Sequence, residues 1–202
     1  RFIDRLIFPI YSINGKLVGF GGRTLTNHGA KYVNSPQTSI FNKSKLLYGY
    51  HLAKEKIYKT KEIIVCEGYL DVIMLHQAGF NNAVATLGTA LTKDHLPLLR
   101  RGEPRVILSY DGDKAGQNAA FKASVMLSQN GFDGGVVIFE NGADPADMVK
   151  DRKIEELEEL FSNPTPFANF AISYIVSSYN INNPVEKQKA LSEANEYLSS
   201  LS

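Results

Sequence analysis

The stretch Arg105-Val-Ile-Leu-Ser-Tyr-Asp111-Gly112-Asp113-Lys114-Ala115-Gly116 is the strongest indication of fold class in this sequence. Its residues 106–108 form a short β-branched, apolar run, which is typical of a strand buried on both faces of a parallel sheet. Gly112 then interrupts the pattern before a predicted helix over residues 114–129, and Gly116 lies in the first turn of that helix. Asp111 and Asp113 therefore leave the carboxyl end of a strand, the edge at which open α/β sheets bind ligands.

This pair of aspartates has two interpretations. Side chains two residues apart in extended backbone point the same way, so Asp111 and Asp113 could share one divalent cation such as Mg²⁺. Without a cation or a proton between them, two such anions repel each other. Alternatively, the pair is a solvated turn in which Asp113 caps the next helix. An EF-hand calcium loop is excluded, because Lys122 stands where that loop needs a bidentate glutamate.

Acidic residues also follow a second predicted strand, residues 62–66. Glu67 and Asp71 are four apart, so a helical turn would place them on one face. They could extend a metal site, or Glu67 could cap the following helix while Asp71 favours its positive amino end. Further on, Gly88-Thr89 after a third strand could offer backbone N–H groups to phosphate, and Asp144 follows a fourth strand.

Strands and helices alternate over residues 61–150, which predicts a compact α/β domain with a parallel sheet flanked by helices. Residues 1–60 read as a basic, β-rich subdomain, with a hairpin turn at Asn14-Gly15. They hold 10 Lys and Arg against 2 Asp and Glu, whereas the remainder holds 12 against 19. Residues 151–202 are expected to form a helical subdomain. A basic segment beside clustered acids suits an enzyme that handles polyanions.

The basic segment interleaves cations with aromatic and amide side chains, a mixture that binds single-stranded nucleic acid. Surface loops of this composition are also common. The candidate residues for nucleic-acid or nucleotide binding are Arg23, Lys31, Tyr32, Asn34 and Lys43, together with Gly88 and Thr89. The single cysteine, Cys66, excludes an internal disulfide and a Cys-rich zinc site. With apolar runs far shorter than a membrane span of about 20 residues, a cytoplasmic location is expected.

The combined pattern resembles the TOPRIM domain, which primases, topoisomerases, some nucleases and recombination proteins share. The motifs that carry the resemblance are Glu67-Gly68, Gly88-Thr89, Asp111-Gly112-Asp113 and Asp144-Pro145. Within that group the chain is similar to the RNA-polymerase domain of bacterial replicative primases. Phe8-Pro9-Ile10, Gly19-Phe20-Gly21-Gly22-Arg23 and Lys31-Tyr32-Val33-Asn34-Ser35-Pro36 match that family's basic subdomain. One departure is Ala146 after the proline, where the family has an acid, so the role of Asp147 is open.

This resemblance implies nucleotidyl transfer that makes short RNA primers from ribonucleoside triphosphates on a single-stranded DNA template. Mg²⁺, or Mn²⁺, is the implied cofactor, with catalysis by Glu67, Asp111 and Asp113 and further metal ligands in Asp71 and Asp144. The family's zinc belongs to a separate amino-terminal module that these residues do not include. The longer protein would act at the replication fork in the nucleoid, with the replicative helicase and single-stranded DNA-binding protein as partners and no membrane. The alternatives are a TOPRIM nuclease or topoisomerase, and a non-catalytic DNA-binding recombination protein.

Overall fold

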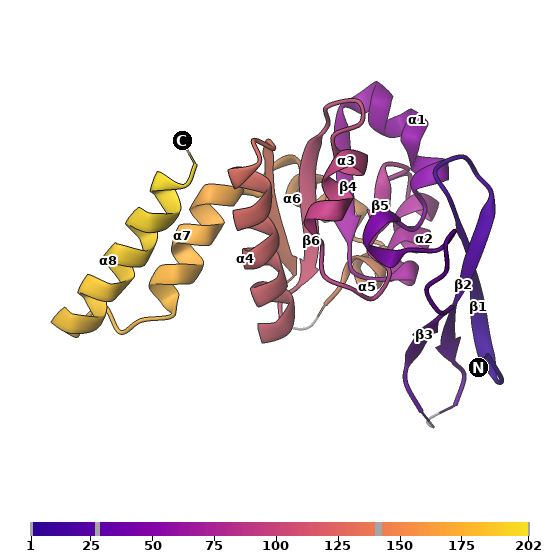
Figure 1. The fold of residues 1–202 in the computed structure, drawn as a ribbon, viewed down its shortest axis with the longest axis horizontal. Coiled ribbons are helices and arrows are strands. Elements are labelled where there is room, and N and C mark those ends of the chain that lie inside the picture. The colour runs from indigo at the N-terminus through magenta and orange to yellow at the C-terminus, as the bar shows by residue number, and fades with distance from the viewer. Residues whose placement is uncertain (1, 27–28, 140–142, 202) are drawn as a thin grey trace.

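A five-stranded sheet forms the centre of the computed structural model, which describes residues 2–26, 29–139 and 143–201 (Figure 1). The sheet order is β5-β4-β6-β7-β8. The first four strands are parallel: β4 (Glu62–Cys66), β5 (Ala83–Ala85), β6 (Arg105–Asp111) and β7 (Gly134–Phe139). The predicted α/β class is confirmed. A two-residue strand that the sequence did not predict, β8 (Thr165–Pro166), pairs antiparallel with β7 and makes the sheet mixed.

Helices cover both faces of this sheet. One face packs against α1 (Tyr50–Thr60), α3 (Leu96–Leu99), α4 (Lys114–Gln129) and α7 (Phe167–Ser177), and the other against α2 (Tyr69–Gln77), α5 (Pro145–Lys150) and α6 (Ile154–Ser162). In β4, Ile63 and Val65 join the first core, whereas Ile64 and Cys66 join the second. Each fully buried aliphatic side chain stabilises the fold by about 1.5–3 kcal/mol. This two-sided burial explains the continuous apolar runs of the central strands.

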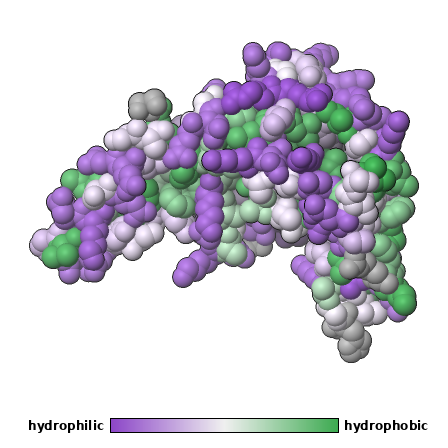
Figure 2. Space-filling model, in the orientation of Figure 1, coloured by the Kyte–Doolittle hydropathy of each residue, from purple (hydrophilic) through white to green (hydrophobic). Residues whose placement is uncertain are grey.

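A small antiparallel sheet of β1 (Arg5–Tyr11), β2 (Leu17–Thr24) and β3 (Tyr32–Asn34) packs against α2 at one side of the large sheet (Figure 1). The predicted hairpin turn is confirmed, with Gly15 at a φ of 76°. Glycine in β2 permits close packing, because a Cβ on Gly21 would lie 2.6 Å from the Tyr69 ring of α2. Figure 2 shows hydrophobic residues along this hairpin, where four stay exposed: Leu6, Ile7, Leu17 and Phe20.

Residues 92–101 do not form one continuous helix. The segment forms a short 3-10 helix, η2 (Lys93–His95), followed by the one-turn helix α3. Pro97 suits a first helical turn, where its missing N–H is not needed, and Gly102 at a φ of 79° reverses the chain soon afterwards. A helix of normal length therefore has no room between these two residues.

At the carboxyl end, α7 and α8 (Pro184–Ser199) form a helical hairpin on the side of the sheet opposite the small antiparallel sheet (Figure 1). The Tyr197 hydroxyl lies 2.9 Å from Ser128 Oγ of α4, which fixes α8 to the main body. The helix α6 instead packs beneath the large sheet through Leu157 and Phe161. The subdomain boundaries after residues 60 and 150 stay predictions.

Candidate nucleotide and metal site

Four acidic side chains meet at the carboxyl edge of the large sheet. Glu67 directly follows β4, Asp111 ends β6, Asp71 lies in the first turn of α2, and Asp144 precedes α5 after β7. They share one cavity of about 390 Å³. Its other lining residues are Arg23, Lys31, Tyr32, Asn34, Gly68, Tyr69, Leu70, Thr86, Gly88, Ala146 and Asp147. Adjacent parallel strands thus bring together acids that lie far apart in the sequence.

Glu67 and Asp111 are joined across the neighbouring strands β4 and β6. The backbone N–H of Asp111 donates to Glu67 Oε1 over 3.1 Å. The interpretation of Glu67 as a helix cap is therefore wrong. Gly68 occupies the cap position of α2, and the Glu67 carboxylate accepts a hydrogen bond from β6 instead. One Glu67 oxygen is thereby positioned, and the half-buried carboxylate faces the cavity.

Asp71 and Asp144 each combine a local hydrogen bond with a place in the cavity. Asp71 is only 8% exposed, and its Oδ2 accepts the Gly68 N–H over 3.0 Å. This bond places the Asp71 carboxylate at the amino end of α2, where the alternative interpretation expected it. Asp144 caps α5, because its Oδ1 accepts the Asp147 N–H over 2.7 Å. Asp147, whose role was open, is exposed at the rim of the same cavity.

The cavity carboxylates have raised pKa values. Burial raises the pKa of Asp71 to about 7, with added repulsion from Asp144 and Asp111. Burial also raises the pKa of Glu67, and the charges of Asp111 and Asp113 add to it. The pKa of Asp111 rises through burial and the charges of Asp144 and Asp113, while Lys31 opposes this shift. These carboxylates repel one another in a partly buried site, so a cation bound between them would stabilise their ionised forms.

Asp113 lies outside the residues that line the cavity. It is exposed and caps α4, with its Oδ1 accepting the Gly116 N–H over 2.7 Å. The cap interpretation of Asp113 is therefore confirmed, and its proposed share in a cation site stays a prediction. The negative charge of Asp113 still helps to raise the pKa values of Glu67 and Asp111.

Cationic and aromatic side chains of the small sheet form the wall opposite the acids. Arg23 comes from β2, Lys31 precedes β3, and Tyr32 lies in β3, with the Arg23 guanidinium carbon 5.8 Å from the centre of the Tyr32 ring. All three line the cavity, as does the Gly88 turn. Two predicted binding residues do not line it, because Lys43 lies in the 3-10 helix η1 (Lys43–Lys45) and Thr89 is exposed beyond the turn.

Tyr69 joins the cationic wall to the acidic edge, a role that the sequence analysis missed. Its ring stacks on Phe8 of β1 at a centroid distance of 5.0 Å, and its hydroxyl is hydrogen-bonded to Asn34 Oδ1. The Asn34 amide in turn donates to the Leu87 carbonyl over 2.9 Å. The aromatic residue after Glu67-Gly68 and the glycines of β2 were the available signals. Thr86, also missed, is buried in the same cavity.

The donor set fits a divalent cation in chemistry, because every acidic ligand offers carboxylate oxygen. Within residues 2–26, 29–139 and 143–201, however, no group of three or more Asp, Glu, His or Cys side chains is close enough to hold one ion in common. Mg²⁺ is usually held by one or two carboxylates, with waters and substrate phosphates completing its shell. The arrangement suits such a site, in which nucleotide and metal bind together.

Replacing Asp71 by Asn is expected to change how stability depends on pH. The pKa of Asp71 is about 7 in the folded chain against an ordinary value of 3.8, so wild-type stability falls as pH rises between these values. At pH 8 without metal, the free energy of unfolding of the variant should exceed that of wild type by about 1–3 kcal/mol. At pH 4 the two free energies of unfolding should be nearly equal. Urea unfolding in EDTA measures this. Equal differences at both pH values, or a pH-dependent gain for the exposed Asp133→Asn, would contradict it.

Comparisons with known proteins place these features in context. Residues 64–149 match a family described as Toprim-like, and residues 1–54 match the amino-terminal domain of the DNA primase catalytic core. A DNA primase of Helicobacter pylori strain J99 is 59% identical over all 202 residues, which span 36% of that relative. The chain thus covers about a third of the curated relatives' length. Among solved structures, the Escherichia coli primase catalytic core is 35% identical, with a TM-score of 0.88 over the whole chain and 65% of that structure. A DnaG primase catalytic domain bound to single-stranded DNA is also 35% identical, with a TM-score of 0.86 over 98% of this chain and 65% of that one.

Proposed function

Since this chain belongs to the family of bacterial DNA primases, we propose that it forms the metal-binding and template-binding part of a primer-synthesising enzyme. The longer protein would join ribonucleoside triphosphates into short RNA primers on single-stranded DNA. The observation that supports this most strongly is the shared cavity, with acids along the sheet edge and Arg23, Lys31 and Tyr32 on the opposite wall. Such a cavity can hold metal, phosphate and base at once.

The acids along the sheet edge would hold the metal. We assign Asp111, Glu67, Asp71 and Asp144 as carboxylates that bind Mg²⁺ or Mn²⁺, with no more than two of them on one ion and with Asp113 contributing from the helix cap. When bound, divalent metal activates the attacking hydroxyl and neutralises the pyrophosphate leaving group. Glu67 Oε1 is oriented by the Asp111 N–H, so the other Glu67 oxygen is the one free to bind metal or accept a proton. Catalysis by Glu67, Asp111 and Asp113 then consists of positioning and charge neutralisation.

The cationic wall would bind template or triphosphate. Arg23 and Lys31 can pair with phosphates, and Tyr32, with 37% of its surface exposed, can stack on a base. Gly88 and Thr89 would offer backbone N–H groups to phosphate, and Lys43 would extend the path along η1. Asn34 is assigned mainly to holding β3 in place, because its side chain already bonds Tyr69 and the Leu87 carbonyl. The solved primase domain bound to single-stranded DNA supports a DNA template.

The other partners belong to the longer protein. A replicative helicase and a single-stranded DNA-binding protein stay proposals for it, as do zinc in a separate module and a place at the replication fork in the nucleoid. Among the described residues, no helix has the length and apolar character needed to cross a membrane. A nuclease, topoisomerase or non-catalytic recombination protein is less well supported, because residues 1–54 match the primase-specific amino-terminal domain.

Titration of this chain with Mn²⁺ tests the metal site. Calorimetry with ATP present should show binding that is weakened at least about tenfold by Asp111→Asn, because one charged ligand is lost. Asp133→Asn makes the same chemical change at the opposite edge of the sheet and should bind like wild type. Both variants should melt cooperatively. If Asp111→Asn binds Mn²⁺ as tightly as wild type, Asp111 is not a metal ligand.

A further inference from the structure

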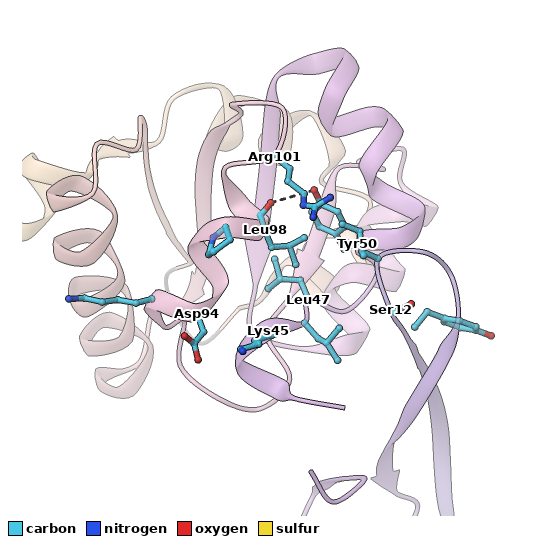
Figure 3. Close-up of a pocket in the computed structure, with 12 residues that line it drawn as sticks. Ser12, Lys45, Leu47, Tyr50, Asp94, Leu98 and Arg101 are labelled. Atoms are coloured by element: carbon cyan, nitrogen blue, oxygen red, sulfur yellow. Dashed lines mark hydrogen bonds between the residues drawn. The ribbon is translucent and has the colours of Figure 1, made fainter. Parts of the chain in front are cut away.

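A second pocket lies where the loop after β1, the segment around η1 and the η2–α3 segment meet (Figure 3). We call it the Lys45–Arg101 pocket. It has a volume of about 440 Å³, within the usual range for small-molecule sites, and shares no lining residue with the acidic cavity. The proposed catalysis leaves it without a role.

The rim of this pocket carries excess positive charge. Lys45, Lys93 and Arg101 line it together with a single acid, Asp94. Asp94 already accepts a hydrogen bond from the Ser44 hydroxyl over 3.2 Å. In the part of the chain that the structure describes, none of the three cations has a carboxylate within 4.0 Å. The rim is therefore suited to an anion.

The floor between these charges is apolar. In Figure 3, Leu47 and Leu98 lie between Arg101 at one end and Lys45 with Asp94 at the other. Because Lys45 and Arg101 lie on opposite sides of these two leucines in Figure 3, a ligand that meets both charges would have to cross the apolar floor. Charge at the ends and apolar surface between them match the alternation of phosphate and base in a nucleotide strand.

The walls of the pocket are held in place by hydrogen bonds. The buried His95 accepts the Thr92 N–H at Nδ1 over 3.1 Å, so its Nε2 carries the proton and donates to the Lys43 carbonyl over 3.1 Å. This bond ties η2 to η1, which carries Lys45. On the other side, the Tyr50 hydroxyl donates to the Leu98 carbonyl over 3.4 Å, the bond dashed in Figure 3. A preformed pocket loses little entropy when it binds a ligand.

We propose that the Lys45–Arg101 pocket binds a nucleotide, with phosphate on Lys45 or Arg101 and the base on the floor formed by Leu47 and Leu98. A free ribonucleotide and one nucleotide of a single strand share this chemistry. Because η1 also carries Lys43, a strand entering this pocket would continue along the path proposed for template. The binding itself does not depend on metal or on catalysis.

The test is made in EDTA, so that the acidic cavity cannot bind phosphate through metal. Fluorescence anisotropy with labelled oligo(dT) and NMR titration with ATP are measured for the chain, for Lys45→Gln and for Arg101→Gln. Lys187→Gln, an exposed cation of α8, is the matched control. The two pocket residues are also exposed, so both variants should keep the wild-type melting temperature.

In the strand arm, each pocket variant should weaken oligo(dT) binding at least about fivefold and reduce the slope of log affinity against log salt by about 0.7. In the free-nucleotide arm, ATP should shift the methyl signals of Leu47 and Leu98, and the variants should reduce the shifts. Either result supports a nucleotide site and identifies its source. Unchanged binding in both arms overturns it, as does a pocket that takes only an acidic peptide such as hexaglutamate. These binding measurements do not depend on primer synthesis, so a full-length protein without that activity would not contradict the proposed nucleotide site.

Discussion

Primer synthesis by the full-length enzyme should fall by a factor on the order of 10²–10³ when Asp111 is replaced by Asn, which is the usual effect of losing one preorganised charge contact. Asp111 ends β6, is half-buried, and its backbone N–H holds Glu67. The substitution keeps that N–H and the side-chain shape but removes the negative charge. The loss should therefore appear in catalysis and metal affinity, not in folding.

The measurement is incorporation of labelled ribonucleotide on single-stranded DNA, with circular dichroism melts in parallel. Asp133→Asn is the control, since Asp133 is exposed at the amino edge of the same sheet and should keep full activity. Glu67→Gln should lose activity to a similar degree. Normal synthesis by the Asp111 variant would show that this carboxylate does not serve the reaction. Loss of the cooperative melt would instead mark Asp111 as a structural residue.

Gly112→Ala should destabilise the fold by about 3 kcal/mol or more and abolish activity with it. A Cβ on Gly112 would lie 2.0 Å from the Phe139 carbonyl oxygen of β7, and hydrogen-bonded strand backbone cannot move aside as the end of a flexible side chain can. The chain between the two aspartates thus passes directly against the neighbouring strand.

Gly68→Ala is the matched control for Gly112→Ala. Its Cβ would lie 3.0 Å from Asp71 Oδ2, the end of a side chain that can shift, so a loss of less than about 1 kcal/mol is expected. Urea unfolding of both variants provides the comparison. Equal stabilities would show that β7 adapts and that Gly112 serves only the flexibility of the turn.

Several features of the site were predictable because they depend on local sequence. Apolar runs followed by acid indicated the central strands and their carboxyl ends, and strand–helix alternation indicated that these ends share an edge. Glu67, Asp71, Asp111 and Asp144 do lie in one cavity with the cationic residues of the basic segment. The short strands β3 and β8 had no such signal, since three and two residues carry no period.

The class of fold, the acidic edge and the family could be predicted from the amino-acid sequence, because periodicity and motif spacing are local properties of the chain. The part that each residue plays depends instead on long-range packing. Asp113 turned to cap α4, Tyr69 bridged the two sheets, and Lys43 lay outside the cavity. The pocket between Lys45 and Arg101 also arose only from packing. Each of these depends on which long-range neighbour a side chain meets, and no local pattern encodes that contact.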